Sequence, residues 1–493
     1  MSQERSEQEL VRIEKLKAAR EKAYPFPNDC SLSDTSKSFL DVLDSELELE
    51  DKPTHTLAGR IMTVREMGKA AFCNIQDRAG LVQVYVRKDE VGDEAFDAFK
   101  TFDIGDIIEV SGAAFKTKKG EPTLRAKSVR QLVKCLHPLP EKWHGLTDVE
   151  KRYRQRYLDL IVNPDVRDTF VKRAQIIAYI RNFFNSRDYV EVETPMMSGL
   201  SAGASAKPFE THHNSLDLDL YMRIALELPL KRLVVGGIER VYEIGRVFRN
   251  EGISIQHNPE FTMIEFYEAY ATYETLMELT EELIEGMCQE VIGSTTVEFS
   301  GKEIDFSRPW KRLTMAESIY EVGGLSRDFD LSDLEGVKKA AEHLGIESVK
   351  GIKDYGKALF EIFDVYVEEK IVNPTFITKH PLSVSPLARP SLEEPEFTDR
   401  FELIVAGMEL ANAFSELNDP EDQRQRFEAQ LAAKAEGDEE AMDLDEDFLC
   451  ALEHGMPPTA GQGIGVDRLV MLLTGSASIR DVILFPQMRP TKE

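Results

Sequence analysis

The chain has 493 residues, of which 42% are hydrophobic and 30% charged, and its formal net charge is −28. This length predicts more than one domain, each with enough apolar residues for a sizeable core. No apolar run reaches the length of a membrane span, the start MSQERSEQEL lacks signal-peptide character, and the five cysteines form no CxxC pair. These features argue against a membrane protein, a disulfide framework and a structural zinc site, and they predict a reducing cytoplasmic location.

The charge is unevenly distributed along the chain. Residues 52–157 contain 20 Lys and Arg against 14 Asp and Glu, whereas residues 421–447 contain 11 acids against 3 bases. A strongly negative total normally argues against a nucleic-acid partner, but a basic module on an acidic body can still bind a polyanion locally. The charge pattern is therefore a hint of such a module and no more.

The N-terminal part begins with a helix and continues with short strands. Residues 3–22 predict an exposed helix, and residues 24–36 predict a polar linker. Short runs that alternate apolar and polar residues follow at 56–68, 70–77, 81–87, 106–117 and 122–135. Five strands, with a helix at 88–103 between the third and the fourth, predict a small barrel of the OB type. The pattern leaves open whether this barrel binds nucleic acid or has no ligand.

The rest of the chain mixes helices with strands that look antiparallel. Residues 166–197 predict a long helix that leads into a strand, residues 315–370 predict amphipathic helices, and residues 421–447 predict a solvated helical insertion. No regular βαβ rhythm is present, so the predicted class is α+β. The predicted parts are an N-terminal helix and linker at 1–50, the barrel at 51–145 and a larger domain at 146–493.

One stretch, residues 249–270, places a carboxylate among aromatic residues. In a strand, Phe261, Met263, Glu265 and Tyr267 share one face. A carboxylate on such a face is costly to bury unless a cation meets it. The stretch therefore raises the question of which cation meets Glu265.

A second strand repeats this pattern, because Asn412, Phe414 and Glu416 also share one face. Just upstream, Glu402 and Glu409 add two acids to a largely apolar run. Any one of these glutamates alone is most simply a solvent-facing residue at a sheet edge. Together they indicate recognition of a cation, either a metal ion or an ammonium group.

Other residues indicate a nucleotide site, although no P-loop motif occurs. Arg249 suits bidentate contact with a phosphate, and Phe261 can stack on a flat ring. Arg468 lies in the first turns of an apolar helix that follows the glycine-rich segment GQGIG. Alone, that segment is as readily a packing turn as an anion site. His212 and His213 lack a third ligand at metal spacing, so ordinary strand or loop histidines are the simpler interpretation.

Three longer motifs carry a family resemblance. The helix and strand ending in Pro195 resemble motif 1 of class II aminoacyl-tRNA synthetases, GRVFRNEGISIQHNPEFTMIEFY resembles motif 2, and GIGVDRLVMLLTGSASIRDVILFP resembles motif 3. The segments GASAKPFETHHNSLDLDLYMRIA, LKRLVVGG and ELNDPEDQRQRF resemble signatures of bacterial-type lysyl-tRNA synthetases. The resemblance implies an OB-fold anticodon-binding domain at 51–145. It implies a class II catalytic domain at 146–493, built on an antiparallel β-sheet flanked by helices.

The resemblance implies a lysine–tRNA ligase that uses ATP and Mg²⁺. Such an enzyme activates L-lysine to lysyl-adenylate, releases pyrophosphate, and transfers lysine to the 3′ end of tRNA(Lys). The resemblance also implies a homodimer formed through motif 1 and no membrane partner. The implied ATP-site residues are Arg249, Glu251, His257, Asn258, Phe261, Glu402, Glu409 and Arg468. Among them, the implied catalytic residues are Arg249, Glu251 and Arg468, and the implied magnesium ligands are Glu402 and Glu409.

The same resemblance implies that the cation that meets Glu265 is the ε-ammonium of the substrate lysine. The implied lysine-site residues are Gly203, Glu227, Arg249, Glu265, Tyr267, Asn412, Phe414 and Glu416. A site built around a charged group rejects neutral amino acids, because they leave its buried acids unpaired. In the barrel, Arg65, Phe72 and Gln83 match positions that contact the anticodon in this family.

Several alternatives stay open. Aspartyl- and asparaginyl-tRNA synthetases share the barrel and motifs, although their pockets should offer a cation to the substrate side chain. A protein-modifying lysyl transferase would lack the barrel, and a non-enzymatic tRNA-binding paralogue would have lost residues of motif 2 or 3. Synthesis of dinucleoside polyphosphates is a further side activity. The chain departs from the expected segment RIAPELYLK at Leu226 and Pro229, and His380 stands where a tyrosine is expected.

Overall fold

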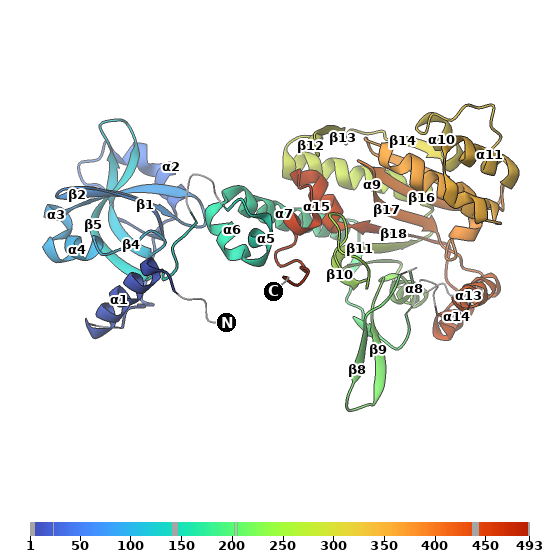
Figure 1. The fold of residues 1–493 in the computed structure, drawn as a ribbon, viewed down its shortest axis with the longest axis horizontal. Helices are drawn as coiled ribbons and strands as arrows, with labels where there is room; N and C mark the ends of the chain where they lie inside the picture. The colour runs from blue at the N-terminus through green and yellow to red at the C-terminus, as the bar shows by residue number, and fades with distance from the viewer. Residues whose placement is uncertain are drawn as a thin grey trace. The chain divides into compact units, whose positions relative to one another are not determined.

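The computed structural model describes residues 5–22, 24–140, 146–201, 203–204, 206–435 and 443–491. The chain forms two compact units, Met1–Thr147 and Asp148–Glu493, whose elements are labelled in Figure 1. Within the described residues, no helix combines the length and apolar character needed to cross a bilayer.

The first unit is a closed five-stranded barrel with helices packed against it (Figure 1). Its strands are β1 (His55–Met67), β2 (Ala70–Gln76), β3 (Leu81–Arg87), β4 (Ile107–Lys116) and β5 (Pro122–Val133). They close in the order β1-β2-β3-β5-β4, and α3 (Lys88–Val91) and α4 (Asp93–Phe99) connect β3 to β4. Alternate residues of β3, Val82, Val84 and Val86, are buried in the barrel core. The predicted OB-type barrel is confirmed.

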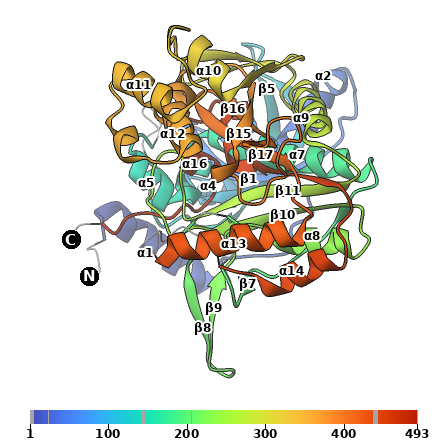
Figure 2. The ribbon, with the colours of Figure 1, turned by 90° about the vertical axis from the view of Figure 1, so that its right-hand side faces the viewer.

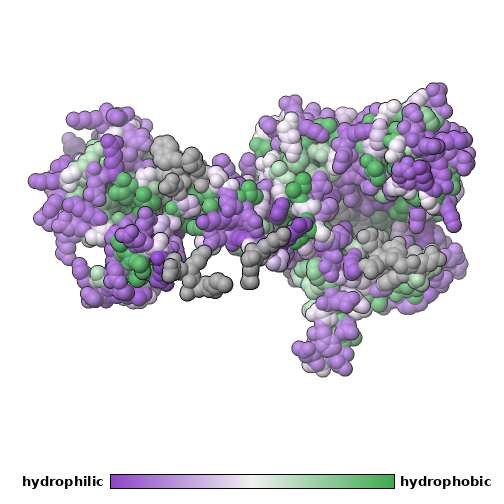
Figure 3. Space-filling model, viewed as in Figure 1, coloured by the Kyte–Doolittle hydropathy of each residue, from purple (hydrophilic) through white to green (hydrophobic). Residues whose placement is uncertain are grey.

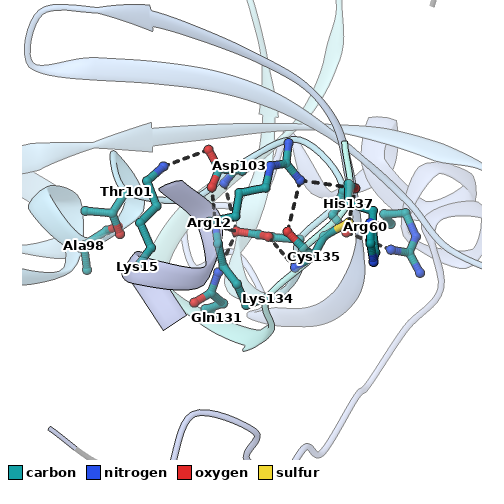
Figure 4. A network of polar contacts seen from close by, with 12 residues as sticks. Arg12, Lys15, Arg60, Ala98, Thr101, Asp103, Gln131, Lys134, Cys135 and His137 are labelled. Atoms are coloured by element: carbon teal, nitrogen blue, oxygen red, sulfur yellow. Dashed lines mark hydrogen bonds and ion pairs between the residues drawn. The ribbon is translucent and has the colours of Figure 1, made fainter. Parts of the chain in front are cut away.

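The N-terminal helix α1 (Glu7–Lys22) docks on this barrel through polar contacts, which Figure 4 shows from close by. Arg12 donates to a backbone carbonyl oxygen just after β5 at 3.0 Å, and Lys15 Nζ lies 2.8 Å from Asp103 Oδ1. Asp103 also pairs with Lys134. The helix forms as predicted. It is not fully exposed, however, because Arg12 is buried against the barrel.

A second helix, α2 (Ser36–Glu46), lies in the segment predicted as helix and linker. Its N-terminus is capped by Thr35, whose side chain accepts from a backbone N–H three residues on. His55 at the start of β1 holds this region to the barrel. Its Nδ1 lies 2.8 Å from Asp34 Oδ2 and its Nε2 lies 2.7 Å from Glu46 Oε2.

The second unit is built on an eight-stranded sheet (Figure 1). In spatial order its strands are β14 (Lys311–Thr314), β15 (Thr375–Pro381), β16 (Phe397–Val405), β17 (Met408–Ser415), β18 (Thr459–Gly465), β11 (Glu260–Ala269), β10 (Arg240–Phe248) and β6 (Val190–Glu191). The outermost pairs at the two ends are parallel, and the pairs between them are antiparallel. The predicted α+β class with an antiparallel sheet is confirmed.

The side chains of β11 alternate between the two faces of this sheet. Ile264 and Phe266 are buried in a core formed with three helices, α7 (Pro164–Asn185), α9 (Tyr273–Met287) and α15 (Val466–Thr474). Tyr267 belongs to a separate core that includes residues of α8 (Glu227–Val235). The strand therefore has the predicted alternation, and its second face carries the carboxylate.

Two further helices lie near α8 (Figure 2). Helix α14 (Glu446–Glu453) packs against α8, and α13 (Pro420–Ala435) packs against α14. Phe427 on α13 and Phe448 on α14 are fully buried in the same core as Tyr267. The stretch predicted as a solvated insertion is therefore packed against the domain at both of its described ends. Residues 436–442 within it lie outside the described residues.

The other elements surround the sheet. The helices are α5 (Val149–Arg154), α6 (Arg156–Val162), α10 (Met315–Glu321), α11 (Leu334–Leu344), α12 (Tyr355–Ile362) and α16 (Ile479–Val482). The strands are β7 (Met197–Ser198), β8 (Glu210–His213), β9 (Leu218–Met222), β12 (Thr296–Phe299) and β13 (Lys302–Asp305). The predicted helices of residues 315–370 are present as α10 to α12. The β8–β9 hairpin projects from the unit with a hydrophilic surface (Figure 3), and both its histidines, His212 and His213, are exposed.

Candidate active site

A cavity of about 520 Å³ lies on the α8 side of the sheet, over the adjacent strands β11, β18 and β17. It is lined by every residue predicted for the ATP and lysine sites except Glu402 and Glu416. The lining residues from that prediction are Gly203, Glu227, Arg249, Glu251, His257, Asn258, Phe261, Glu265, Tyr267, Glu409, Asn412, Phe414 and Arg468. Residues from distant parts of the second unit therefore meet in one hollow.

The floor of this cavity is made by glycines of β18. Gly461 pairs with Tyr267 on one side and with Phe414 on the other, and Gly463 pairs with Glu265. A Cβ atom at Gly461 would collide with the Tyr267 ring, so only glycine leaves room between the two flanking rows of side chains. The glycine-rich segment, for which a packing turn and an anion site were both open, is therefore a strand, and its glycines leave room for the side chains of the flanking strands.

Arg249 follows β10 directly. Its backbone N–H donates to the carbonyl oxygen of Pro259 at 2.8 Å, which closes the loop between β10 and β11. Its guanidinium carbon lies 5.3 Å from the centre of the Phe261 ring, and its Nε donates to the carbonyl oxygen of Ile224 at 3.4 Å. A guanidinium oriented by a ring in this way presents a planar fork that suits phosphate or carboxylate. Glu251, two residues on, is exposed at the rim.

Arg468 lies in the first turn of α15. Its Nη1 donates to the carbonyl oxygen of Glu409 at 2.5 Å, and its Nη2 donates to His257 Nε2 at 3.3 Å. Burial lowers the pKa of His257, and the neighbouring Arg468 lowers it further. The imidazole is therefore neutral at pH 7 and can accept from the arginine. This end of the cavity carries positive charge.

Two of the predicted residues have a clear conformational role. Asn258 Nδ2 donates to the carbonyl oxygen of Glu260 at 2.6 Å, and its Oδ1 accepts from the backbone N–H of Gln487 at 3.2 Å. Asn258 thus orders the loop before β11. Gly203 has a φ of +94°, whereas a Cβ there would lie in ordinary contact, 3.4 Å from Ala225. Its backbone conformation, rather than a need for space, calls for glycine.

The opposite end of the cavity is acidic and centres on Glu265, which is 4% exposed. Its Oε1 accepts from the backbone N–H of Leu226 at 3.1 Å, and its Oε2 accepts from the Tyr267 hydroxyl at 3.1 Å. Burial raises the pKa of Glu265 to about 7, and the nearby Glu227 carboxylate contributes to this rise. Leu226 stands where the family segment has proline, which carries no N–H, so this departure supplies a donor to the carboxylate.

Glu416 lies one residue beyond the end of β17. Its shared face with Asn412 and Phe414 predicted that it would line the same site, but it is not among the residues that line the cavity. It is fully buried and pairs with Lys231, whose ammonium also pairs with Glu227. Lys231 was missed in the sequence, although its i,i+4 spacing from Glu227 on a helix is the signal that could have found it.

Glu402 on β16 is also buried away from the cavity. Its Oε1 lies 2.5 Å from Arg400 Nη2, and Arg400 Nε donates to Asn412 Oδ1 at 3.0 Å. Burial raises the pKa of Glu402 to about 8, and although Arg400 opposes this shift, the Glu409 carboxylate adds to it. Arg400 lines the cavity and was missed in the sequence. Within the described residues, no cluster of three or more His, Cys, Asp or Glu side chains could hold a metal ion.

A row of aromatic rings crosses one face of the barrel in the first unit. The Phe72 ring centre lies 4.6 Å from that of Tyr85, which lies 5.7 Å from that of Phe115. Gln83 is two residues from Tyr85 on β3 and therefore shares its face. Arg65 is exposed and pairs with Phe72 across the β1–β2 ladder. Phe72 thus lies between Arg65 and Tyr85 across the ladders, and Tyr85 and Phe115 continue the row of rings.

The sequences of the second unit and of the barrel each match a known protein family. A family model described as tRNA synthetases class II (D, K and N) matches residues 148–489, and one described as an OB-fold nucleic acid binding domain matches residues 55–132. The chain belongs to the class II tRNA synthetases. This synthetase is 56% identical to the lysine–tRNA ligase of Halalkalibacterium halodurans, over 97% of this chain and 96% of that protein.

Other relatives are similarly close. The synthetase is 54% identical to the lysine–tRNA ligases of Oceanobacillus iheyensis and of Staphylococcus epidermidis, in each case over 99% of this chain and 100% of that protein. Full-length similarity at this level confirms the predicted resemblance to class II lysyl-tRNA synthetases.

Proposed function

We infer that this synthetase is a lysine–tRNA ligase, which activates L-lysine with ATP to lysyl-adenylate and then transfers lysine to the 3′ end of tRNA(Lys). The observation that carries this inference is the environment of Glu265. In the part of the chain that the structure describes, this carboxylate is buried at the cavity wall with hydrogen bonds but no ion pair of its own. A cationic substrate side chain supplies the missing partner. The full-length relatives that are named lysine–tRNA ligases support the same function.

The two ends of the cavity suit the two small substrates. ATP lies at the positive end, where Phe261 stacks on adenine, His257 and Asn258 lie near the triphosphate, and Arg468 binds the γ-phosphate. Arg249 lies between the ends. It holds the α-phosphate and stabilises the charge that develops there as the lysine carboxylate attacks phosphorus and pyrophosphate departs. The carboxylate is already a nucleophile, so alignment and electrostatics suffice without a protein general base.

The acidic end takes the amino acid. Glu265 and Tyr267 receive the ε-ammonium, and Glu227 with Glu251 positions the α-ammonium. The remaining proposed lysine-site residues are Gly203, Asn412, Phe414 and Glu416. A neutral or acidic side chain would leave Glu265 unpaired, which can discriminate by roughly 10⁴-fold or more. For this reason lysine is favoured over aspartate and asparagine, the other two substrates of the matching family.

Glu402 and Glu409 are the residues that would hold magnesium. Glu409 lines the cavity, and Glu402 is buried and paired with Arg400. These carboxylates come from the neighbouring strands β16 and β17, and Glu409 contributes to the raised pKa of Glu402. A divalent cation relieves that repulsion. Mg²⁺ is commonly held by one or two carboxylates together with substrate phosphates, so a complete site made by protein alone is not required. When bound, the ion would neutralise charge on the phosphates of ATP.

The barrel, residues 51–145, reads the anticodon. Replacing Phe72 with Ala is expected to raise the KM for tRNA(Lys) by about 10- to 100-fold, because stacking on an aromatic side chain contributes about 1–3 kcal/mol per base. Aminoacylation kinetics with varied tRNA measure this effect. Lysine-dependent ATP–pyrophosphate exchange without tRNA is the internal control and should not change. An unchanged KM for tRNA would place the anticodon elsewhere.

The synthetase forms a homodimer through motif 1 and works in the cytoplasm. An apolar groove along α6 and α7 supports the dimer, with Phe170, Val171, Ala174 and Leu484 among its lining residues. Val171 and Leu484 are exposed in the single chain. All five cysteines are free, which accords with a reducing compartment.

The decisive test of function is ATP–pyrophosphate exchange with each of the twenty amino acids, without tRNA. We expect exchange with lysine alone. Exchange with aspartate or asparagine instead would agree with the class II family but would contradict the assignment of the cavity as a lysine pocket. If no amino acid supports exchange, the assay is repeated with tRNA. Absence of exchange in that assay too would show that the protein is not an active ligase.

A further inference from the structure

Lys231 is a buried cation next to the proposed lysine pocket. Its side chain is fully buried in α8, and its ammonium pairs with Glu227 Oε1 and Glu416 Oε2. The ammonium also lies 5.3 Å from the Phe414 ring centre and 5.8 Å from that of Phe448. Such a site costs several kcal/mol in lost hydration and has to be offset by close partners. An apolar residue would fill the same space without that cost, so the charge itself requires an explanation.

The charges around the pocket provide one. Three carboxylates face this region, Glu227 from α8, Glu265 from β11 and Glu416 from beyond β17, and each influences the protonation of another. Among the described residues, Tyr267 on β11 also faces the cluster, and it is neutral because burial raises the pKa of its hydroxyl well above its usual value. The charged groups Arg249 and Glu251 line the same cavity, and Glu251 is exposed at the rim. The elements packed on the other sides contribute Gly461 and Phe448, which carry no charge.

Lys231 is the internal counter-ion of this acidic cluster. With these three buried carboxylates ionised, three negative charges face one positive charge, which leaves two buried negative charges for the substrate. Glu251 at the rim is exposed to solvent and is not part of this buried balance. Lysine brings two ammonium groups, one on its α-carbon and one at the end of its side chain, while its carboxylate is taken by Arg249. A substrate with a single ammonium leaves one buried carboxylate uncompensated.

We propose that Lys231 is a specificity-determining residue that acts through Glu227 and Glu416 and sets the charge of the pocket to match an amino acid with two ammonium groups. The proposal rests on the proposed function as a lysine–tRNA ligase. Without this internal cation, at least one carboxylate has to take up a proton in the empty pocket. Lysine can then bind well only after that proton is released.

The experiment is a double-mutant cycle with Lys231→Met and Glu416→Gln, assayed by lysine-dependent ATP–pyrophosphate exchange. Met keeps the length of the side chain and removes its charge. At about pH 7.5, Lys231→Met is expected to raise the KM for lysine at least about 10-fold, while the KM for ATP changes less than about 3-fold. In the Glu416→Gln background, the same substitution is not expected to raise the lysine KM, because removing one negative and one positive charge leaves two negative charges for the substrate, as in the wild type.

The pH profile gives a second readout that a packing role would not move. The lysine KM of Lys231→Met should fall as pH rises from about 7 to 8.5, because the carboxylate that took up a proton loses it again. The wild-type KM should vary less over that range. Arg232→Met on the same helix is the matched control, because Arg232 pairs with Asp445 at 2.6 Å and does not line the cavity. It should leave the lysine KM unchanged.

Several results would overturn the proposal. An equal increase in lysine KM in both backgrounds, with a flat pH profile, would show that Lys231 only fills space. Lys231→Met alone could fail to fold. In that case, a double variant that folds and has a lysine KM no higher than that of Glu416→Gln supports the charge role. If neither the single nor the double variant folds, the charge role is contradicted. Absence of lysine-dependent exchange in the wild type, both without and with tRNA, would instead contradict the proposed function itself.

Discussion

Replacing Glu265 with Gln is expected to lower kcat/KM for lysine by two or more powers of ten in ATP–pyrophosphate exchange. The side chain keeps its size, but the ε-ammonium then meets an amide dipole in place of a carboxylate. Leaving a buried charge without its partner costs about 3–5 kcal/mol. Most of the loss should appear in the KM for lysine, because the interaction is present before the chemical step. ATP binding, measured directly by titration, should stay close to wild type.

Glu265 also predicts a pH dependence of substrate binding. Its pKa of about 7, raised by burial and by Glu227, means that it takes up a proton as pH falls below that value. A protonated Glu265 no longer pairs with an ammonium, so the wild-type KM for lysine should rise as pH falls from about 7.5 to 6. In Glu265→Gln the same position cannot titrate, and this part of the profile should flatten.

A glutamate on the same strand provides the matched control for this substitution. Glu260 also lies on β11, but its side chain is 38% exposed, pairs with Arg246 at 3.4 Å and does not line the cavity. Glu260→Gln should therefore leave the lysine KM and its pH profile unchanged. If Glu265→Gln behaved like this control, the cation site would lie elsewhere in the cavity and the assignment of the pocket would have to be abandoned.

The two-residue period of a strand explains why this part of the site could be predicted from sequence. Phe261, Glu265 and Tyr267 fall on one face whatever the partners of the strand are, because successive side chains point to opposite sides. The barrel was predictable for a similar reason, since five short alternating runs separated by turns have few other ways to bury their apolar faces. The structure brings these residues to one cavity, and their chemical roles stay predictions.

Residues whose position depends on tertiary packing escaped the sequence patterns. Glu416 keeps to the face of Phe414, since a Cβ at Gly461 would meet both Glu416 and Tyr267, but the alternation does not show that Lys231 from α8 is its partner. Such a partner is set by the packing of neighbouring elements. Lys231 likewise resembles an ordinary surface lysine until the burial of α8 against α14 turns it inward. The glycine-rich segment, for which a packing turn and an anion site were both open, forms β18, where glycine allows the Tyr267 ring to approach the strand closely.

Replacing Arg249 with Gln is expected to lower kcat for lysine-dependent exchange by about 10²–10³-fold at saturating ATP and lysine. A preorganised donor aimed at developing charge typically contributes that much to the rate. The guanidinium already lies over the ring of Phe261, so in the proposed reaction it needs no reorganisation as the α-phosphate is attacked. Steady-state exchange gives kcat, and a rapid-quench measurement of lysyl-adenylate formation shows that the chemical step is the one slowed.

Comparing two substitutions at Arg249 separates charge from geometry. Arg249→Lys keeps the positive charge but loses the planar fork, so a rate between wild type and Arg249→Gln is expected if both matter. Arg246→Gln is the control, because Arg246 also belongs to β10 but has a side chain 41% exposed, paired with Glu260 and outside the cavity. A kcat for Arg249→Gln within about threefold of this control would mean that the α-phosphate is stabilised by another cation. Arg400 and Arg468 would then be the next to test, since both also line the cavity.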